Sequence, residues 1–137
     1  MFRTVVSLSL LLLGLISTAM TGFSQAPAAA TPENAAAFIG DWTLSAQGGQ
    51  GAVQSELSIK VDSGKVVGSL TWPGQASQSI KDISKDEKSL FLKYEMDYQG
   101  MAVPVVITLT PNGDKVALTM DFAGGSYTMP GTAVKKK

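Results

Sequence analysis

Residues 90–109, with the sequence LFLKYEMDYQGMAVPVVITL, show most clearly how this chain folds. Apolar and polar side chains alternate on both sides of Gln99 and Gly100, first along residues 90–98 and again along residues 101–109. Alternation with a period of two is typical of a strand with one buried and one wet face, and a two-residue turn containing glycine joins two such strands. The stretch therefore predicts an antiparallel β-hairpin.

The same alternation recurs from residue 38 onward, so that the chain shows eight predicted strands in all. The six others are residues 40–46, 53–61, 66–72, 77–83, 116–122 and 126–133. Their connections are too short for parallel crossovers, which need about a dozen residues or more. We therefore expect an all-β fold, an eight-stranded antiparallel up-and-down barrel whose first and last strands pair, with a two-sheet sandwich as the alternative.

The barrel interpretation assigns positions to two residues. Pro104 interrupts the sixth predicted strand, and because proline lacks an N–H group we expect it at a bulge or a weakly paired edge. Trp42 stands near the start of the first predicted strand, and we expect it to be buried at the base of the barrel. Residues 31–38 would then fold beneath its ring.

The first 24 residues have the pattern of a secretory signal peptide. Arg3 provides a positive start, residues 5–16 are largely apolar, and Gly22 and Ser24 suit cleavage after Ser24. The apolar run of about a dozen residues is short for a membrane span, although an uncleaved anchor is the alternative. We expect a secreted or periplasmic protein that has no stable membrane span once the signal peptide is removed.

The remaining chain divides into three parts. Residues 25–37 predict an Ala- and Pro-rich linker followed by a short N-terminal helix, for which Thr31 is a suitable N-cap. Residues 38–134 form the predicted barrel, and residues 135–137 are a basic tail.

The composition argues against several functions. The 137 residues include 11 Lys and Arg against 11 Asp and Glu, so the formal net charge is zero, and there is neither His nor Cys. Disulfides, thiol nucleophiles, imidazole catalysis and ordinary zinc sites are therefore excluded, and a neutral chain lacks the basic face of a nucleic-acid binder. Glu95, Asp97 and Asp121 fall on the predicted outer wall. We therefore expect no enzyme, no metal site and no cofactor.

The two predicted ends of the barrel differ in chemistry. The turns at one end, the mouth, carry no charge, whereas those at the base carry Asp, Glu and Lys. We predict a ligand site from the inward-facing aromatic and methionine residues at the mouth, namely Trp72, Met96, Tyr98, Met101, Met120, Phe122, Tyr127 and Met129. The alternative is that these side chains simply fill a small barrel.

A resemblance to a known class of barrels rests on three motifs. They are Gly40-Asp41-Trp42, the sequence GKVVGSL that ends at Leu70, and the strand and turn from Met96 to Met101, which precede a glycine-rich final hairpin. The chain resembles lipocalin-like (calycin-type) barrels, and in particular small secreted bacterial β-barrel domains found beside hydrolases and amidohydrolases. The resemblance implies an accessory or binding module without a reaction of its own.

Two functions remain as hypotheses. The first is a non-enzymatic, secreted binding module that takes a small apolar or aromatic ligand at the mouth. The second is a secreted inhibitor or partner-binding protein, which would use an N-terminal arm, residues 25–30, or the outer barrel surface to contact a secreted protein.

Overall fold

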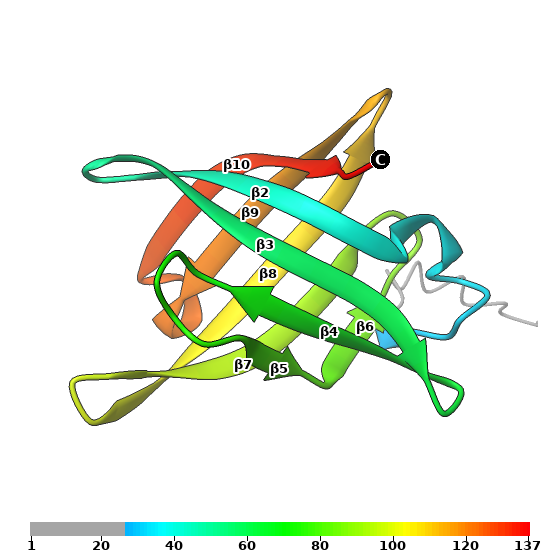
Figure 1. The fold of residues 1–137 in the computed structure, drawn as a ribbon, viewed down its shortest axis with the longest axis horizontal. Coiled ribbons are helices and arrows are strands. Elements are labelled where there is room, and N and C mark those ends of the chain that lie inside the picture. Colours follow the sequence, from blue (N-terminus) through cyan, green and yellow to red (C-terminus); the bar gives the residue numbers. More distant parts are fainter. Residues whose placement is uncertain (1–26) are drawn as a thin grey trace, which may run out of the picture.

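The computed structural model describes residues 27–137, and the predicted signal peptide lies outside them (Figure 1). Strands make up most of residues 27–137, and none of the helical turns among them could span a membrane. The strands are β1 (Ala28–Ala29), β2 (Gly40–Gly48), β3 (Gly51–Asp62), β4 (Lys65–Thr71), β5 (Gln78–Ile80), β6 (Asp82–Lys85), β7 (Leu90–Tyr98), β8 (Met101–Asn112), β9 (Lys115–Phe122) and β10 (Tyr127–Lys135), with short 3₁₀ turns η1 (Ala36–Phe38) and η2 (Ala123–Gly125).

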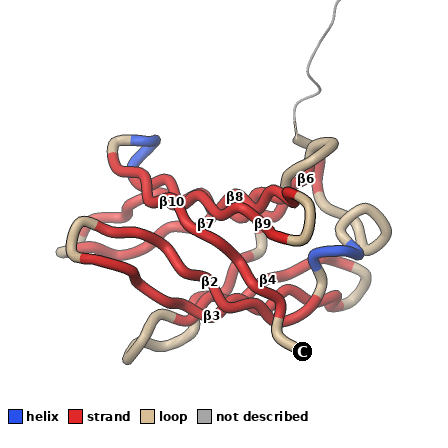
Figure 2. The backbone as a smooth tube through the Cα atoms, turned by 90° about the horizontal axis from the view of Figure 1, so that it is seen from above, coloured by secondary structure: helices blue, strands red, loops and turns tan. Residues whose placement is uncertain are grey.

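All strands belong to one antiparallel sheet that curls into a barrel-like shape. The strand order is β1-β6-β7-β8-β9-β10-β2-β3-β4-β5, and β2 pairs with β10, which confirms the predicted pairing of the first and last strands. Strands β5 and β6 lie near opposite ends of this order, yet Lys81 alone separates them in sequence. The two ends of the sheet must therefore meet at Lys81, and in Figure 2 strands β2, β3 and β4 lie opposite β7, β8 and β9.

The predicted number of eight strands is wrong, since residues 27–137 already form ten. The predicted strand 77–83 is split into β5 and β6 at Lys81, because the chain changes partner there from β4 to β7. The tenth strand, β1, arises because the end of the predicted linker pairs with β6.

The predicted N-terminal helix is also wrong. Thr31 does act as a cap: its Oγ1 accepts a hydrogen bond of 3.1 Å from the Asn34 N–H, and Asn34 Oδ1 accepts one of 2.7 Å from the Thr31 N–H. Only a turn and the 3₁₀ turn η1 follow, and Gly40 already begins β2. The segment is too short to propagate an α-helix beyond its nucleus.

The core consists of the inward-facing side chains of the curled sheet. Alternate residues along each strand are buried, as the period of two requires. Fully burying a Leu or Ile side chain contributes about 1.5–3 kcal/mol each, so these residues are the main source of stability. The largest buried side chains include Leu44, Leu57, Ile59, Leu70, Leu92 and Ile107.

Three prolines mark places where a strand has a partner on one side only. Pro104 precedes Val105, the first residue of β8 that pairs with β9, which confirms the expected weakly paired position. Pro130 likewise precedes Gly131, the first residue of β10 that pairs with β2, and Pro111 pairs with β9 beyond the end of the β7–β8 ladder. Proline cannot donate to a ladder, so these are the positions where it costs least.

Trp42 closes the base of the barrel, as predicted. Its side chain is 4 % exposed, and its Nε1–H donates a hydrogen bond of 2.8 Å to the carbonyl oxygen of Phe38, which is itself buried. The Nζ of Lys135 lies 5.7 Å from the centre of the Trp42 ring. The indole is therefore held by packing, by a backbone acceptor and by a cation on one face.

Gly131 of β10 lies against the backbone of β2, and we expect Gly131→Ala to destabilise the protein strongly. A Cβ atom at this position would stand 2.0 Å from Ser45 O and 2.8 Å from Ala46 Cα, so the backbone of β2 would have to move. We expect a loss of about 2–3 kcal/mol in the free energy of unfolding, measured by urea denaturation.

Gly68→Ala is the matched control. Its Cβ would lie 3.2 Å from Leu92 Cδ2, the end of a side chain that can shift, so the loss should be well below that of Gly131→Ala. Equal losses for the two variants would contradict the close packing of β10 on β2.

Candidate functional site

Four chain connections gather at one end of the structure, at the left of Figure 1. They are the turns between β2 and β3, β4 and β5, β7 and β8, and β9 and β10, and none of their residues is charged. The connections at the other end include Asp86, Glu87, Lys88 and Asp114. The uncharged end is the predicted mouth of the barrel.

The structure places five of the eight predicted site residues in or against the core. Met120 and Met129 are buried, so they line the interior below the mouth. Trp72, Met96 and Phe122 are partly buried and pack against the core on the side of the mouth. These side chains are within the barrel, as the alternation of each strand predicted.

The other three predicted site residues are exposed. Tyr98 and Met101 pair directly at the tip of the β7–β8 hairpin and are 58 % and 69 % exposed. Tyr127 is 49 % exposed, and its hydroxyl accepts a hydrogen bond of 3.1 Å from the Gly49 N–H. Its ring also contacts that of Phe122, with 5.9 Å between the centroids. The mouth therefore presents apolar and aromatic surface to solvent.

A hollow of about 280 Å³ opens beside Trp72. The ladder between β3 and β4 ends at the pair Glu56–Thr71, so beyond this pair β3 and the loop after β4 separate. The hollow is a notch in the wall at this point, and we call it the Trp72 notch. Six of the residues that line it are Gln54, Ser55, Glu56, Thr71, Trp72 and Gln75.

Ser55 lines the Trp72 notch from the inner side of β3. The residue is only 2 % exposed, and its hydroxyl oxygen has no hydrogen-bond partner among the described residues. Most buried polar groups in proteins are paired, and leaving one unpaired costs about 1–3 kcal/mol. Ser55 therefore has an unused donor and acceptor next to the notch.

Tyr94 provides a second buried hydroxyl without a partner, on β7. Burial raises the pKa of its phenol above the ordinary value, and the nearby Trp72 side chain, as a donor, opposes that rise. Trp72 approaches Tyr94 Oη without reaching good hydrogen-bond geometry, so this hydroxyl has no partner within residues 27–137. The structure thus brings Trp72 close to two inward hydroxyls that come from β3 and β7.

Sequence reasoning missed Ser55 and Tyr94 as candidate site residues. Both stand at inward positions of clearly alternating strands, where the other residues are mostly apolar. A polar residue at one of the alternate positions that face the core is the signal that could have identified them.

The outward carboxylates of the mouth are engaged locally. Asp97 Oδ1 accepts a hydrogen bond of 3.0 Å from the Gly100 N–H, and Asp121 Oδ1 accepts one of 2.8 Å from the Thr128 hydroxyl. Within residues 27–137, no three His, Cys, Asp or Glu side chains come together as a metal site. The carboxylates therefore support turns and strand pairs.

Comparison of the chain with protein-family models, curated proteins and solved structures gives no match. The geometry at the mouth is therefore the basis for a function. Aromatic and thioether side chains with two unpaired hydroxyls can hold an apolar body and orient one polar group.

We expect Ser55→Ala to raise the free energy of unfolding by about 1 kcal/mol, because it removes a buried hydroxyl that has no partner. Urea denaturation measures the change. Ser58→Ala, on the outer face of the same strand, is the control and should have almost no effect. A clear loss of stability for Ser55→Ala would mean that its hydroxyl is satisfied in the free protein.

Tyr94 should make the protein less stable at alkaline pH. Because its pKa is raised in the folded state, the unfolded chain loses this proton first once the pH exceeds about 10. The free energy of unfolding then falls as the pH rises from the pKa that Tyr94 has in the unfolded chain to the higher pKa it has in the folded protein. The Tyr94→Phe variant should not show this part of the fall. Denaturation of both proteins between neutral and strongly alkaline pH tests this, and parallel curves would contradict it.

Proposed function

We propose that this protein is an exported, non-enzymatic binding module of lipocalin-like build that takes a small apolar or aromatic ligand at its mouth. The observation that carries the proposal is the pair of buried, unpaired hydroxyls, Ser55 and Tyr94, beside Trp72 and next to an open notch. Export is supported by the predicted signal peptide, and the lipocalin-like build by the Gly40-Asp41-Trp42 opening.

The notch indicates the size and polarity of the ligand. Its volume of about 280 Å³ lies near the lower limit of about 300 Å³ for small-molecule sites, which suits a single ring with one polar substituent. The polar substituent would bond to Ser55 or Tyr94, which can both donate and accept. The ring would contact Trp72.

The β7–β8 hairpin would extend the apolar surface around the ligand. Beyond its last pair with β9, this hairpin continues with Met96 and Val103, which are half-buried, and then Tyr98 and Met101, which are exposed. Apolar side chains on a hairpin that lacks one neighbouring strand can adapt to ligands of different shape. This favours loose specificity.

A second candidate function, binding of a secreted protein partner, is favoured by the geometry of β1. This strand pairs with β6 through two residues, and the Ala30 N–H adds a bond of 3.0 Å to Ile83 O. A hollow of about 500 Å³ that Pro27 and Lys93 help to line adjoins it. A partner's strand can add to a short edge strand of this kind. Deleting residues 25–30 would abolish such binding and leave the mouth site intact.

The mouth proposal predicts that benzyl alcohol and cyclohexanol change the fluorescence of Trp72, whereas glycerol does not. Burying one ring contributes about 2–3 kcal/mol before association costs, so we expect weak binding, with a dissociation constant of about 10 mM or higher. Trp42→Phe should keep the signal because Trp42 lies at the base, and Trp72→Phe should abolish it.

Two variants test the role of the hydroxyls. Ser55→Ala and Tyr94→Phe should each weaken the binding of benzyl alcohol by about tenfold, which corresponds to one hydrogen bond. Unchanged affinity in both variants, or a Trp72 signal that neither probe alters, would overturn the mouth site. In that case the partner-binding function would take its place.

A further inference from the structure

The outer wall formed by β2 to β5 carries hydroxyl groups in place of the usual alternation of charges. Three serines, Ser58, Ser69 and Ser79, lie side by side across β3, β4 and β5. The next row toward the mouth joins Thr43, Glu56 and Thr71. Solvent-facing positions of a sheet often carry Lys and Glu, which makes a wall of Ser and Thr a distinctive surface.

This wall has a hollow of its own, of about 230 Å³. Six of its lining residues are Asp41, Glu56, Ser58, Ser69, Thr71 and Ser77. Because Glu56 and Thr71 also line the Trp72 notch, the two hollows adjoin on the wall. We call them together the β3–β4 groove, with serines at one end and Trp72 at the other.

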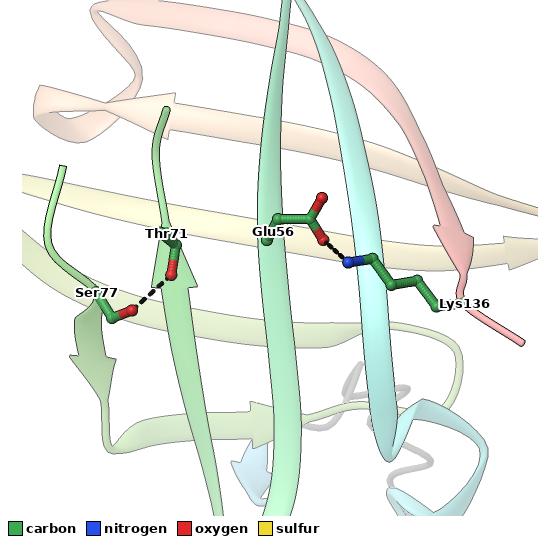
Figure 3. A network of polar contacts seen from close by, with 4 residues as sticks. All are labelled: Glu56, Thr71, Ser77 and Lys136. Atoms are coloured by element: carbon green, nitrogen blue, oxygen red, sulfur yellow. Dashed lines mark hydrogen bonds and ion pairs between the residues drawn. The ribbon is translucent and has the colours of Figure 1, made fainter. Parts of the chain in front are cut away.

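Polar contacts hold the middle of the groove in place (Figure 3). Thr71 Oγ1 and Ser77 Oγ lie 2.6 Å apart in a hydrogen bond, and Glu56 Oε2 lies 2.5 Å from the Nζ of Lys136. The Lys136 N–H is fixed in turn by a bond of 2.8 Å to Asp41 O. Glu56 and Lys136 are both about half exposed, so the pair adds little stability, but it neutralises the carboxylate.

We propose that the β3–β4 groove binds a neutral carbohydrate. Sugars offer closely spaced hydroxyls that both donate and accept, together with an apolar C–H face. The groove supplies matching groups: hydroxyls at Ser69, Thr71 and Ser77, a neutralised carboxylate at Glu56, and an aromatic side chain at Trp72.

The buried hydroxyl of Ser55 gives an independent indication of a ligand at the Trp72 end. The residue lines the notch and is nearly fully buried, and its hydroxyl has no partner in the part of the chain that the structure describes. A sugar hydroxyl that enters the notch would satisfy it. The Glu56–Lys136 pair is neutral and Asp41 adds a carboxylate to the groove, so uncharged sugars should bind better than sulfated ones.

The test measures binding of cellopentaose, maltopentaose and chitopentaose to the purified protein by titration calorimetry, with a sulfated heparin pentasaccharide for comparison. At least one neutral pentasaccharide should bind, and more tightly than the sulfated one. The double variant Thr71→Val/Ser77→Ala should weaken that binding by about tenfold or more, because it removes two hydroxyls and keeps the shape of the strand.

Two controls accompany the double variant. Thr71→Ser keeps the hydroxyl and should retain binding. Thr108→Val/Thr119→Val removes a directly opposed pair of outward hydroxyls from β8 and β9, and should leave the affinity within about twofold of the parent. Circular dichroism verifies that all variants are folded.

Three results would overturn the groove proposal: no binding of any neutral pentasaccharide at about 10 mM, tighter binding of the sulfated one, or equal losses in the groove and control variants. The outcome is separable from that of the mouth site. Tyr94→Phe should weaken the binding of benzyl alcohol and leave pentasaccharide binding unchanged, since Tyr94 lies inside the barrel. If benzyl alcohol fails to bind, the groove proposal can still hold. If no pentasaccharide binds, the mouth site can still hold.

Discussion

The passage of the chain from β5 through Lys81 to β6 is the constraint on which the rest of the structure depends. These two strands belong to opposite ends of one antiparallel sheet, and a single residue between them forces those ends together. The sheet must therefore curl, and one face of every strand turns inward. The hydrophobic core, the closed base and the open mouth all follow from this closure.

The two ends of the barrel-like sheet are built for different tasks. At the base, Trp42 is buried, donates a hydrogen bond to Phe38 O and has the Lys135 ammonium over its ring. At the mouth, β8 and β10 lose one neighbour at Pro104 and Pro130, and the hairpins extend separately. Missing ladder partners lower local stability, which is typical of regions that bind ligands.

Both candidate sites arise where β3 and β4 part. The ladder ends at Glu56 and Thr71, and the gap that follows opens inward to Ser55 and outward to the hydroxyl-rich wall. Trp72 lies at this gap, next to both the inward opening and the outer wall. The same strand separation thus provides an apolar contact for the mouth site and an aromatic end for the β3–β4 groove.

The alternation of side chains was enough to predict the all-β class and most strand positions, because each strand's pattern is local. The pairing of β2 with β10 and the burial of Trp42 at the base followed from the short connections, which allow only an antiparallel sheet that closes on itself. The split at Lys81, the strand β1 and the missing helix depend on which distant segments become partners. The sequence predicted the mouth residues by type, but whether Met120 is buried and Met101 exposed depends on how far each hairpin extends. The unpaired hydroxyls of Ser55 and Tyr94 were decided only by the tertiary structure, since a missing hydrogen bond depends on every neighbour that packs around the group.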